Sequence, residues 1–333
     1  MNNYFKITLF FFIFCSNLVK GQDMHFTQFY ASPLYLNPAF VGSNVCSRIS
    51  LTYRNQWPGI TTAYKSFLLS GDHYIQKYNL GVGFLFGNDV AGSGQLKTTI
   101  INPMISYGLK ISRKVGIRFG FQPGIGIRSI NFNDLYFGDQ IARGGNVPSM
   151  ETPTQNKVYF DVGAGALVFS EKLWLGTSFY HLTQPNTSLV NGETNMPLKY
   201  SLHGGAKIPL NNGENDPFQR RYISPAFNYR GQKKFDQLDV GFYYTQYIFN
   251  LGLWYRGIPL LKAYKPGYRN DDAVAIIIGV QANRLNIGYS YDLTISKLKG
   301  LTSGAQEVTL SYQLCKLKKK SKKYGLLIPC PKF

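Results

Sequence analysis

Few side chains in this sequence are spaced for catalysis or for metal binding. No two histidines have the spacing of metal ligands, and no two cysteines lie within four residues of each other. His181 and His203 could assist a serine nucleophile in a barrel lipase, but no serine motif accompanies them. Alternating glycines resemble those of phosphate-binding loops, yet no strand–loop–helix pattern surrounds them. We therefore expect no enzymatic activity, no metal and no cofactor. The isolated histidines are His25, His73, His181 and His203.

The composition favours a surface that faces lipid. The chain has 24 Tyr, 24 Phe and 34 Gly in 333 residues. Only 16% of its residues are charged, compared with about 25% in an average soluble domain. No apolar run after the N-terminus reaches the ~18–20 residues of a membrane-spanning helix. The net charge of +19 is spread over the chain, which does not favour nucleic-acid binding.

The first 21 residues have the pattern of a secretory signal peptide. Lys6 precedes an apolar run over 7–14, and the small residue Gly21 precedes the expected cleavage site. Lipid attachment at Cys15 is an alternative, but Phe14 is large where that signal needs a small residue. Cleavage leaves three cysteines, and an odd number in an exported chain predicts at least one free or intermolecular thiol. These are Cys46, Cys315 and Cys330.

The most informative pattern has a period of two residues. From 114 to 128, apolar residues occupy the odd positions, and Gly, Lys, Arg or Gln occupy the even positions. Such alternation places the two sets on opposite faces of a strand. Fourteen segments are long enough for tilted membrane strands of about 9–11 residues, and the second and fourth alternate least clearly. The segments are 46–57, 61–75, 78–88, 94–110, 113–130, 156–170, 172–182, 197–210, 219–230, 233–245, 247–257, 272–282, 284–295 and 305–315.

The connections favour a barrel in the outer membrane. If the first strand runs outward, most long loops fall on the far side (131–155, 183–196 and 258–271), and 211–218 is the exception. Longer extracellular loops and short periplasmic turns are typical of such barrels. We predict an all-β fold, a transmembrane antiparallel β-barrel of 14 strands over 46–315, closed because lipid tolerates no open strand edge. A soluble β-sandwich is the alternative, but its outward face would be charged.

The alternation also assigns side chains to the two faces of the wall. In the first and eleventh strands Arg54, Gln56, Trp254 and Arg256 face inward, and Arg128 lies at a similar level. One hypothesis is a basic vestibule at the outer mouth that attracts an anionic partner segment or solute. The alternative is that the arginines pair across the lumen with acidic residues. Those acidic residues are Asp161, Asp239, Asp292 and Glu307.

Two terminal segments fall outside the strand pattern. Residues 22–45 are aromatic, do not alternate and contain Pro33 and Pro38, so they form a periplasmic segment or a plug of the lumen. Residues 316–333 form a basic periplasmic tail, either solvated or bound to headgroups or a partner. The glycines of the inward face either bend the sheet or admit another backbone. They are Gly81, Gly83, Gly116, Gly120, Gly124, Gly126, Gly163, Gly165, Gly252 and Gly288.

Three motifs resemble those of one known family over essentially the whole mature chain. The first begins with Gln22-Asp23, continues with Phe26-Thr27-Gln28-Phe29-Tyr30 and Ser32-Pro33, and ends with Leu36-Asn37-Pro38-Ala39-Phe40-Val41-Gly42. The second is Tyr53-Arg54-Asn55-Gln56-Trp57-Pro58-Gly59, and the third is Leu253-Trp254-Tyr255-Arg256-Gly257. In order and spacing they resemble the PorP/SprF family.

The resemblance implies a non-enzymatic outer-membrane barrel of the type IX secretion system of Bacteroidota. It implies export and surface attachment of a secreted protein or adhesin through a C-terminal sorting domain, with a possible link to gliding motility. An anion-preferring solute channel and a core component that binds periplasmic ring proteins are the alternatives. Partners would be this cargo, other type IX components and outer-membrane lipid, without nucleic acid. Candidate partner-binding residues are Arg54, Gln56, Trp57, Arg128, Tyr136, Phe137, Arg143, Trp254, Arg256, Tyr264, Tyr268 and Arg269.

Overall fold

A computed structural model describes most of the predicted mature chain. The described residues are 23–44, 46–60, 63–92, 95–131, 135, 138–145, 155–190, 192–210, 221–233, 235–258, 263–265, 268–296, 300–314 and 328. For 263–265, 268 and 269 only the backbone is described. The predicted signal peptide over 1–21 lies outside these residues, as does the predicted tail over 316–333 apart from Ile328.

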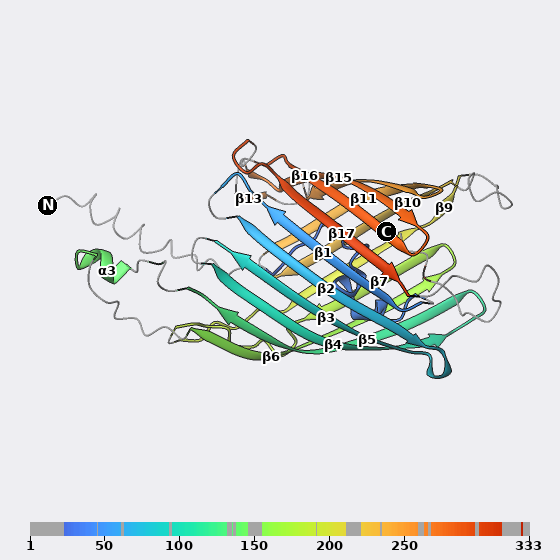
Figure 1. Ribbon diagram of the computed structural model, residues 1–333, viewed down its shortest axis with the longest axis horizontal. Coiled ribbons are helices and arrows are strands. Elements are labelled where there is room, and N and C mark those ends of the chain that lie inside the picture. The colour runs from blue at the N-terminus through green and yellow to red at the C-terminus, as the bar shows by residue number, and fades with distance from the viewer. Residues whose placement is uncertain are drawn as a thin grey trace.

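Fourteen antiparallel strands form a closed barrel, as predicted (Figure 1). Each strand pairs with the next, and the last pairs with the first from Arg48↔Gln313 to Gln56↔Ala305, so the wall has no open seam. The strands are β1 (Arg48–Gln56), β2 (Tyr64–Ile75), β3 (Leu80–Ala91), β4 (Leu96–Lys110), β5 (Val115–Ser129), β6 (Asn156–Ser170), β7 (Leu173–Tyr180), β8 (Lys199–Ala206), β10 (Arg221–Gln232), β11 (Phe235–Gln246), β12 (Phe249–Gly257), β15 (Asp271–Ala282), β16 (Leu285–Thr294) and β17 (Ala305–Gln313).

The remaining elements are short. No helix among the described residues has the length and the apolar character to cross a membrane. The short elements are α2 (Pro33–Leu36), η1 (Pro38–Phe40), η2 (Gln76–Tyr78), α3 (Gly138–Ala142), β9 (Ile208–Pro209), β13 (Ala263–Lys265) and β14 (Tyr268–Arg269).

The two ends of the barrel differ in their connections. The end at which β1 finishes carries the connections 130–155, 181–198 and 258–270, and we call it the long-loop end. It is the left end in Figure 1, where α3 and β13 lie. The opposite, short-turn end has brief connections such as the turn at 283–284, apart from the stretch between β8 and β10. Asn283 has a positive φ of 51° in this turn, a left-handed conformation that asparagine tolerates well.

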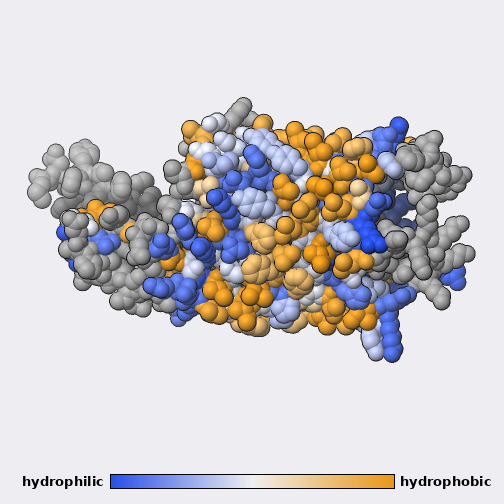
Figure 2. Space-filling model, viewed as in Figure 1, coloured by the Kyte–Doolittle hydropathy of each residue, from blue (hydrophilic) through white to orange (hydrophobic). Residues whose placement is uncertain are grey.

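The outer face of the wall is apolar and the inner face is polar. On β12, Phe249, Leu251 and Leu253 are exposed on the outside, whereas Asn250 and Trp254 are buried inside. Figure 2 shows hydrophobic side chains gathered over the middle of the barrel and hydrophilic ones toward both ends. The predicted alternation thus places apolar side chains toward lipid.

A charge on the lipid-facing side should destabilise the barrel according to its depth. Leu253→Arg, in the middle of β12, should cost about 2–4 kcal/mol of unfolding free energy in lipid vesicles, because it places a cation near the bilayer midplane. Leu285→Arg, at the first residue of β16, should cost at most about 1 kcal/mol. Equal costs at both positions, measured by urea unfolding, would contradict this placement in the bilayer.

Candidate functional site

The lumen contains the chain's own N-terminal residues 23–44, which we call the lumen segment. Nearly all of it is buried, with Phe26 and Tyr30 at most 2% exposed. Pro33 and Pro38 each occupy the first position of a short helix, α2 or η1. The Asn37 side chain accepts a hydrogen bond of 2.8 Å from the Ala39 N–H and so caps η1. The segment therefore has a defined fold inside the barrel.

The lumen segment extends along the lumen from one end to the other. The Asp23 carboxylate accepts a hydrogen bond of 3.1 Å from Lys199, the first residue of β8, at the long-loop end. The Gly42 N–H donates a hydrogen bond of 2.8 Å to Asp72, near the last residue of β2, at the short-turn end. The segment therefore begins near the long-loop end and finishes near the short-turn end, where the chain continues into β1.

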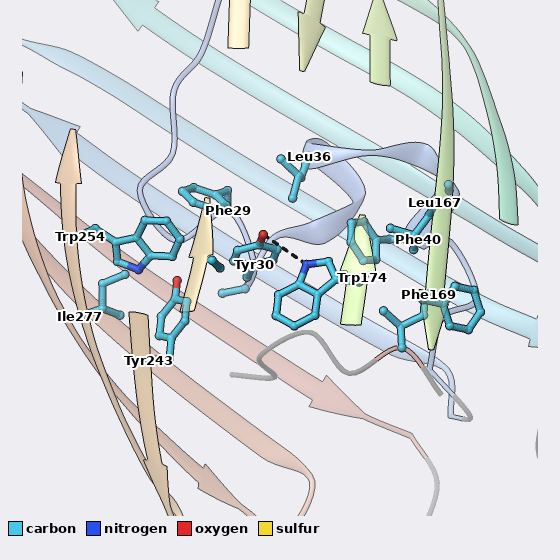
Figure 3. Packing of buried hydrophobic residues seen from close by; sticks show 14 of the residues in the cluster. Phe29, Tyr30, Leu36, Phe40, Leu167, Phe169, Trp174, Tyr243, Trp254 and Ile277 are labelled. Carbon is cyan, nitrogen blue, oxygen red and sulfur yellow. Dashed lines mark hydrogen bonds between the residues drawn. The ribbon is translucent and has the colours of Figure 1, made fainter. Parts of the chain in front are cut away.

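An aromatic cluster packs the lumen segment against the wall (Figure 3). The Trp174 indole N–H donates to the Tyr30 hydroxyl at 3.3 Å, and that hydroxyl donates to the Gly204 carbonyl at 3.1 Å. The Phe29 and Trp254 rings meet edge to face, with their centroids 4.8 Å apart. Such aromatic pairs stabilise beyond the area that they bury. The cluster is Phe29, Tyr30, Ala31, Leu36, Ala39, Phe40, Leu167, Phe169, Trp174, Ala226, Tyr243, Trp254, Ala275, Ile277 and Ile328.

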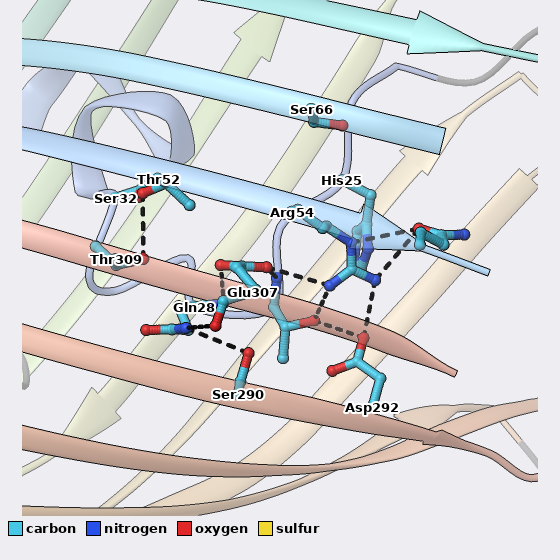
Figure 4. Close-up of polar contacts among 12 residues, drawn as sticks. His25, Gln28, Ser32, Thr52, Arg54, Ser66, Ser290, Asp292, Glu307 and Thr309 are labelled. Atoms are coloured by element: carbon cyan, nitrogen blue, oxygen red, sulfur yellow. Dashed lines mark hydrogen bonds and ion pairs between the residues drawn. The ribbon is translucent and has the colours of Figure 1, made fainter. Parts of the chain in front are cut away.

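A buried carboxylate holds the backbone of the lumen segment (Figure 4). The two oxygens of Glu307 accept hydrogen bonds from the N–H groups of Thr27 at 2.7 Å and Gln28 at 2.9 Å. Arg54 pairs with Glu307 at 3.1 Å and with Asp292 at 2.8 Å. The Arg54 and Glu307 side chains are at most 2% exposed. Wall and segment thus form one charge network.

The inward arginines are mostly neutralised within the lumen. Arg256 pairs with Asp239 at 2.9 Å and with Asp292 at 3.0 Å, and Arg230 also pairs with Asp239 at 2.8 Å. With Arg54 also paired, the hypothesis of a basic vestibule is wrong for Arg54 and Arg256, because each is buried against carboxylates. The partners named in the alternative are correct, but the pairs do not cross the lumen: Glu307 and Asp239 are directly opposite Arg54 and Arg256 on the adjacent strands. Asp292 of β16 lies two strands away from each arginine along the wall.

Arg128 differs from the other two arginines. It donates a hydrogen bond of 3.0 Å to the Thr187 hydroxyl, and it has no ion pair with any residue that the structure describes. Asp161, offered above as a partner of the arginines, instead contacts His181.

Several glycines of the wall make room for the lumen segment. A Cβ at Gly120 would lie 2.2 Å from the Ala39 nitrogen, and one at Gly81 would lie 2.3 Å from the Val41 oxygen. These are backbone atoms, so a side chain at either position would displace the segment. Gly288 meets the Gln28 side chain of the segment in the same way, at 2.3 Å.

Other inward glycines have a role that neither interpretation of the sequence included. A Cβ at Gly126 would lie 2.1 Å from the Tyr159 ring, and one at Gly116 would lie 2.8 Å from the Phe169 ring. Each of these glycines makes room for the aromatic side chain directly opposite it on the neighbouring strand. Close approach of a second backbone thus explains only part of the glycine pattern.

A histidine fastens the beginning of the lumen segment. His181, directly after β7, contacts Asp23 at 2.8 Å and Asp161 at 2.7 Å. Burial alone would lower the pKa of His181, but the attraction of the Asp23 carboxylate and the hydrogen bonds to both carboxylates raise it to about 9. The imidazolium therefore bridges a residue of the segment to one of β6 at neutral pH.

This bridge should make stability depend on alkaline pH. Folding raises the pKa of His181 from 6.5 to about 9. The charged imidazole therefore stabilises the folded barrel fully below pH 6.5, and this stabilisation is lost as the pH rises through about 9. We expect His181→Gln to cost on the order of 3 kcal/mol of unfolding free energy at pH 6 and little at pH 10. A cost that does not change with pH would contradict the bridge. His73→Gln, at the short-turn end, is the matched control.

The other candidate residues are dispersed. Trp254 is buried in the aromatic cluster, and Gln56 accepts hydrogen bonds from Arg54. Trp57 packs its ring against Tyr64, with centroids 5.6 Å apart. Arg54, Trp254 and Arg256 face the chain's own segment rather than the surface. The remaining candidates are the exposed Arg143, paired with Asp139; Tyr136 and Phe137, outside the described residues; and Tyr264, Tyr268 and Arg269, described by backbone alone in the β13–β14 pair.

Cys46 lies immediately after the lumen segment and is disulfide-bonded. Its partner lies outside the described residues. The expected free or intermolecular thiol stays a prediction.

Comparison with known protein families finds one family that matches most of the chain. The family described as "Type IX secretion system membrane protein PorP/SprF" matches residues 18–312, which include the lumen segment and nearly all of the barrel. The chain belongs to this family. The resemblance of the three motifs is thereby confirmed. As a PorP/SprF protein with a closed 14-strand barrel, it lies in the outer membrane.

Solved structures with similar folds are distant in sequence. The CymD monoaromatic hydrocarbon channel is 10% identical, with a TM-score of 0.47 over 84% of this chain and 90% of that chain. BamA from Haemophilus ducreyi lacking POTRA domains 1-3 is 10% identical, with a TM-score of 0.41 over 81% and 70% of the two chains. No curated protein matches the chain.

Proposed function

We propose that this PorP/SprF barrel is a non-enzymatic docking protein for a secreted protein or adhesin. Through the cargo's C-terminal sorting domain it serves export and surface attachment, and in a gliding organism it contributes to motility. The observation that supports this proposal is the filled lumen. A barrel whose interior is occupied by its own bonded segment offers a rigid end surface for protein contact rather than an open path.

In this proposal the long-loop end faces outward and receives the cargo. Arg143 and the β13–β14 pair lie at this end. Arginine and aromatic side chains are the usual anchors of protein interfaces. The family assignment supports a role beside other type IX components.

The rival function is an anion-preferring channel. It requires a continuous aqueous path lined by unpaired cations, whereas Arg54 and Arg256 are paired with carboxylates and buried beneath the lumen segment. A core component that binds periplasmic rings through the basic tail is the other alternative.

Deletion of the gene tests the proposal. We expect a secreted adhesin with a C-terminal sorting domain to disappear from the cell surface, as measured by antibody labelling of intact cells, and to return when the gene is supplied in trans. An unchanged amount of surface adhesin would contradict the docking function. Affinity purification from native membranes separates the alternatives, because cargo should copurify in one case and periplasmic ring proteins in the other.

A further inference from the structure

A cavity lies at the long-loop end, between the lumen segment and the wall from β3 to β8. Its volume is about 90 Å³. A buried water needs roughly 10–15 Å³ on this scale, so the cavity can hold a ligand of several non-hydrogen atoms. Its lining includes Asp23 and Met24 of the lumen segment and Asp89, Ile100, Arg128 and His181 of the wall.

The strand register places two opposite charges in one row across the cavity. Asp89 of β3 is opposite Thr98 of β4, and Thr98 is opposite Arg128 of β5. Neighbouring strands are about 4.8 Å apart, so the backbones of Asp89 and Arg128 are separated by roughly 10 Å. Ile100 and Gly126 form the next row, which gives the cavity an apolar wall below the charges.

Most charges around the cavity are already paired. Asp23 and Asp161 contact His181, and Asp23 also contacts Lys199, at distances from 2.7 to 3.1 Å. These four charges therefore balance one another, and the charges of Asp89 and Arg128 remain.

Asp89 and Arg128 lack charged partners among the residues that the structure describes. Asp89 accepts one hydrogen bond, of 2.5 Å, from the Ser66 hydroxyl. Arg128 donates to Thr187, but its Nε is buried without a partner. Asp89 and Arg128 are half-buried. A charge that is partly removed from water and has no charged partner is costly, so this arrangement suits a ligand that supplies the missing charges.

We propose that the cavity binds a small amine carboxylate of the amino-acid class. The ligand's ammonium group would donate to Asp89, and its carboxylate would accept from Arg128. The short apolar body between the two charges would lie against Met24 and Ile100. This site does not depend on the docking function proposed above, because it involves no cargo and no other secretion component.

A cavity that holds only water is the competing description, and titration of the whole purified barrel separates the two. The probes are L-alanine, β-alanine and 4-aminobutyrate, whose two charges are progressively further apart, with butylamine and butyrate as single-charge controls. We expect saturable heat from at least one zwitterion by isothermal titration calorimetry, and weaker binding of both controls. Dialanine distinguishes a peptide end from a free amino acid as the source of the ligand.

Two variants test the assigned contacts. Asp89→Asn and Arg128→Gln should each weaken binding at least about tenfold, because each replaces a charge-assisted hydrogen bond to the ligand by a neutral one. Glu171→Gln and Arg113→Gln, exposed at the opposite end, should bind like the wild type. A difference in gel mobility between unheated and heated samples shows that each variant forms a folded barrel. No saturable heat from any zwitterion at millimolar concentration, or equal binding by Asp89→Asn and the wild type, would overturn the proposal.

Discussion

Removal of the lumen segment should convert a barrel that is nearly silent in planar bilayers into a conducting one. In the wild type, residues 23–44 are packed along the whole lumen and bonded to the wall at both ends. A barrel of this size leaves an aqueous space once its contents are gone, and the charges of the wall can then be hydrated. We expect deletion of residues 24–43 to raise the single-channel conductance at least about tenfold over the wild type.

A substitution that leaves the segment covalently intact should act in the same direction. Gly120→Leu places a side chain where its Cβ alone would lie 2.2 Å from the Ala39 nitrogen, so the segment must move. Gly108→Ala is the matched control, because its Cβ would make only ordinary contacts, the nearest at 3.5 Å to Arg118. A wild type that conducts like the deletion variant would contradict the filled lumen.

Removal of the buried Arg54 charge should strongly destabilise the barrel. Arg54→Met leaves Glu307 without a cation, and Glu307 is completely buried. Loss of one partner of a buried pair typically costs about 3–5 kcal/mol, and we expect a loss of that size in urea unfolding. The double variant Arg54→Met/Glu307→Gln should recover part of the loss, because it removes the uncompensated charge.

The control for this prediction is an arginine in an exposed pair. Arg143 pairs with Asp139 in α3, where its side chain is 40% exposed. Solvent screens such pairs, so Arg143→Met should have little effect on unfolding. Equal losses from Arg54→Met and Arg143→Met would contradict the inference that the lumen network is dry and coupled.

The sequence predicts the barrel wall well because lipid imposes a simple rule on it. Every second side chain must be apolar, so alternation such as that over 114–128 reveals both the strand and its faces. Even β4, where alternation is weak, is a strand between two well-marked neighbours. The ends of strands differ by a few residues because turns depend on local backbone conformation. Asn79, at φ 53°, is one such residue.

The lumen could be predicted only in outline. The motif that begins at residue 22 carries the segment, but its contacts join residues far apart in the chain, as in the pair of Thr27 and Glu307. The pairing of His181 with Asp23 and Asp161 was missed, because an isolated histidine in the sequence gives no sign of its neighbours in space. The position of His181 at the end of a strand with inward Asp161 nearby is the only available signal.

A disulfide across the lumen tests the central claim most directly. The side-chain oxygens of Ser32 and Thr52 are 2.6 Å apart, one on the lumen segment and one on the inner face of β1. We expect Ser32→Cys/Thr52→Cys to cross-link almost completely in outer membranes upon mild oxidation, as identified by mass spectrometry of the linked peptides. Ser32→Cys/Ile49→Cys, with the second cysteine on the outer face, should not cross-link. Absence of the first link, or equal yields of both, would contradict a barrel filled by its own N-terminal segment.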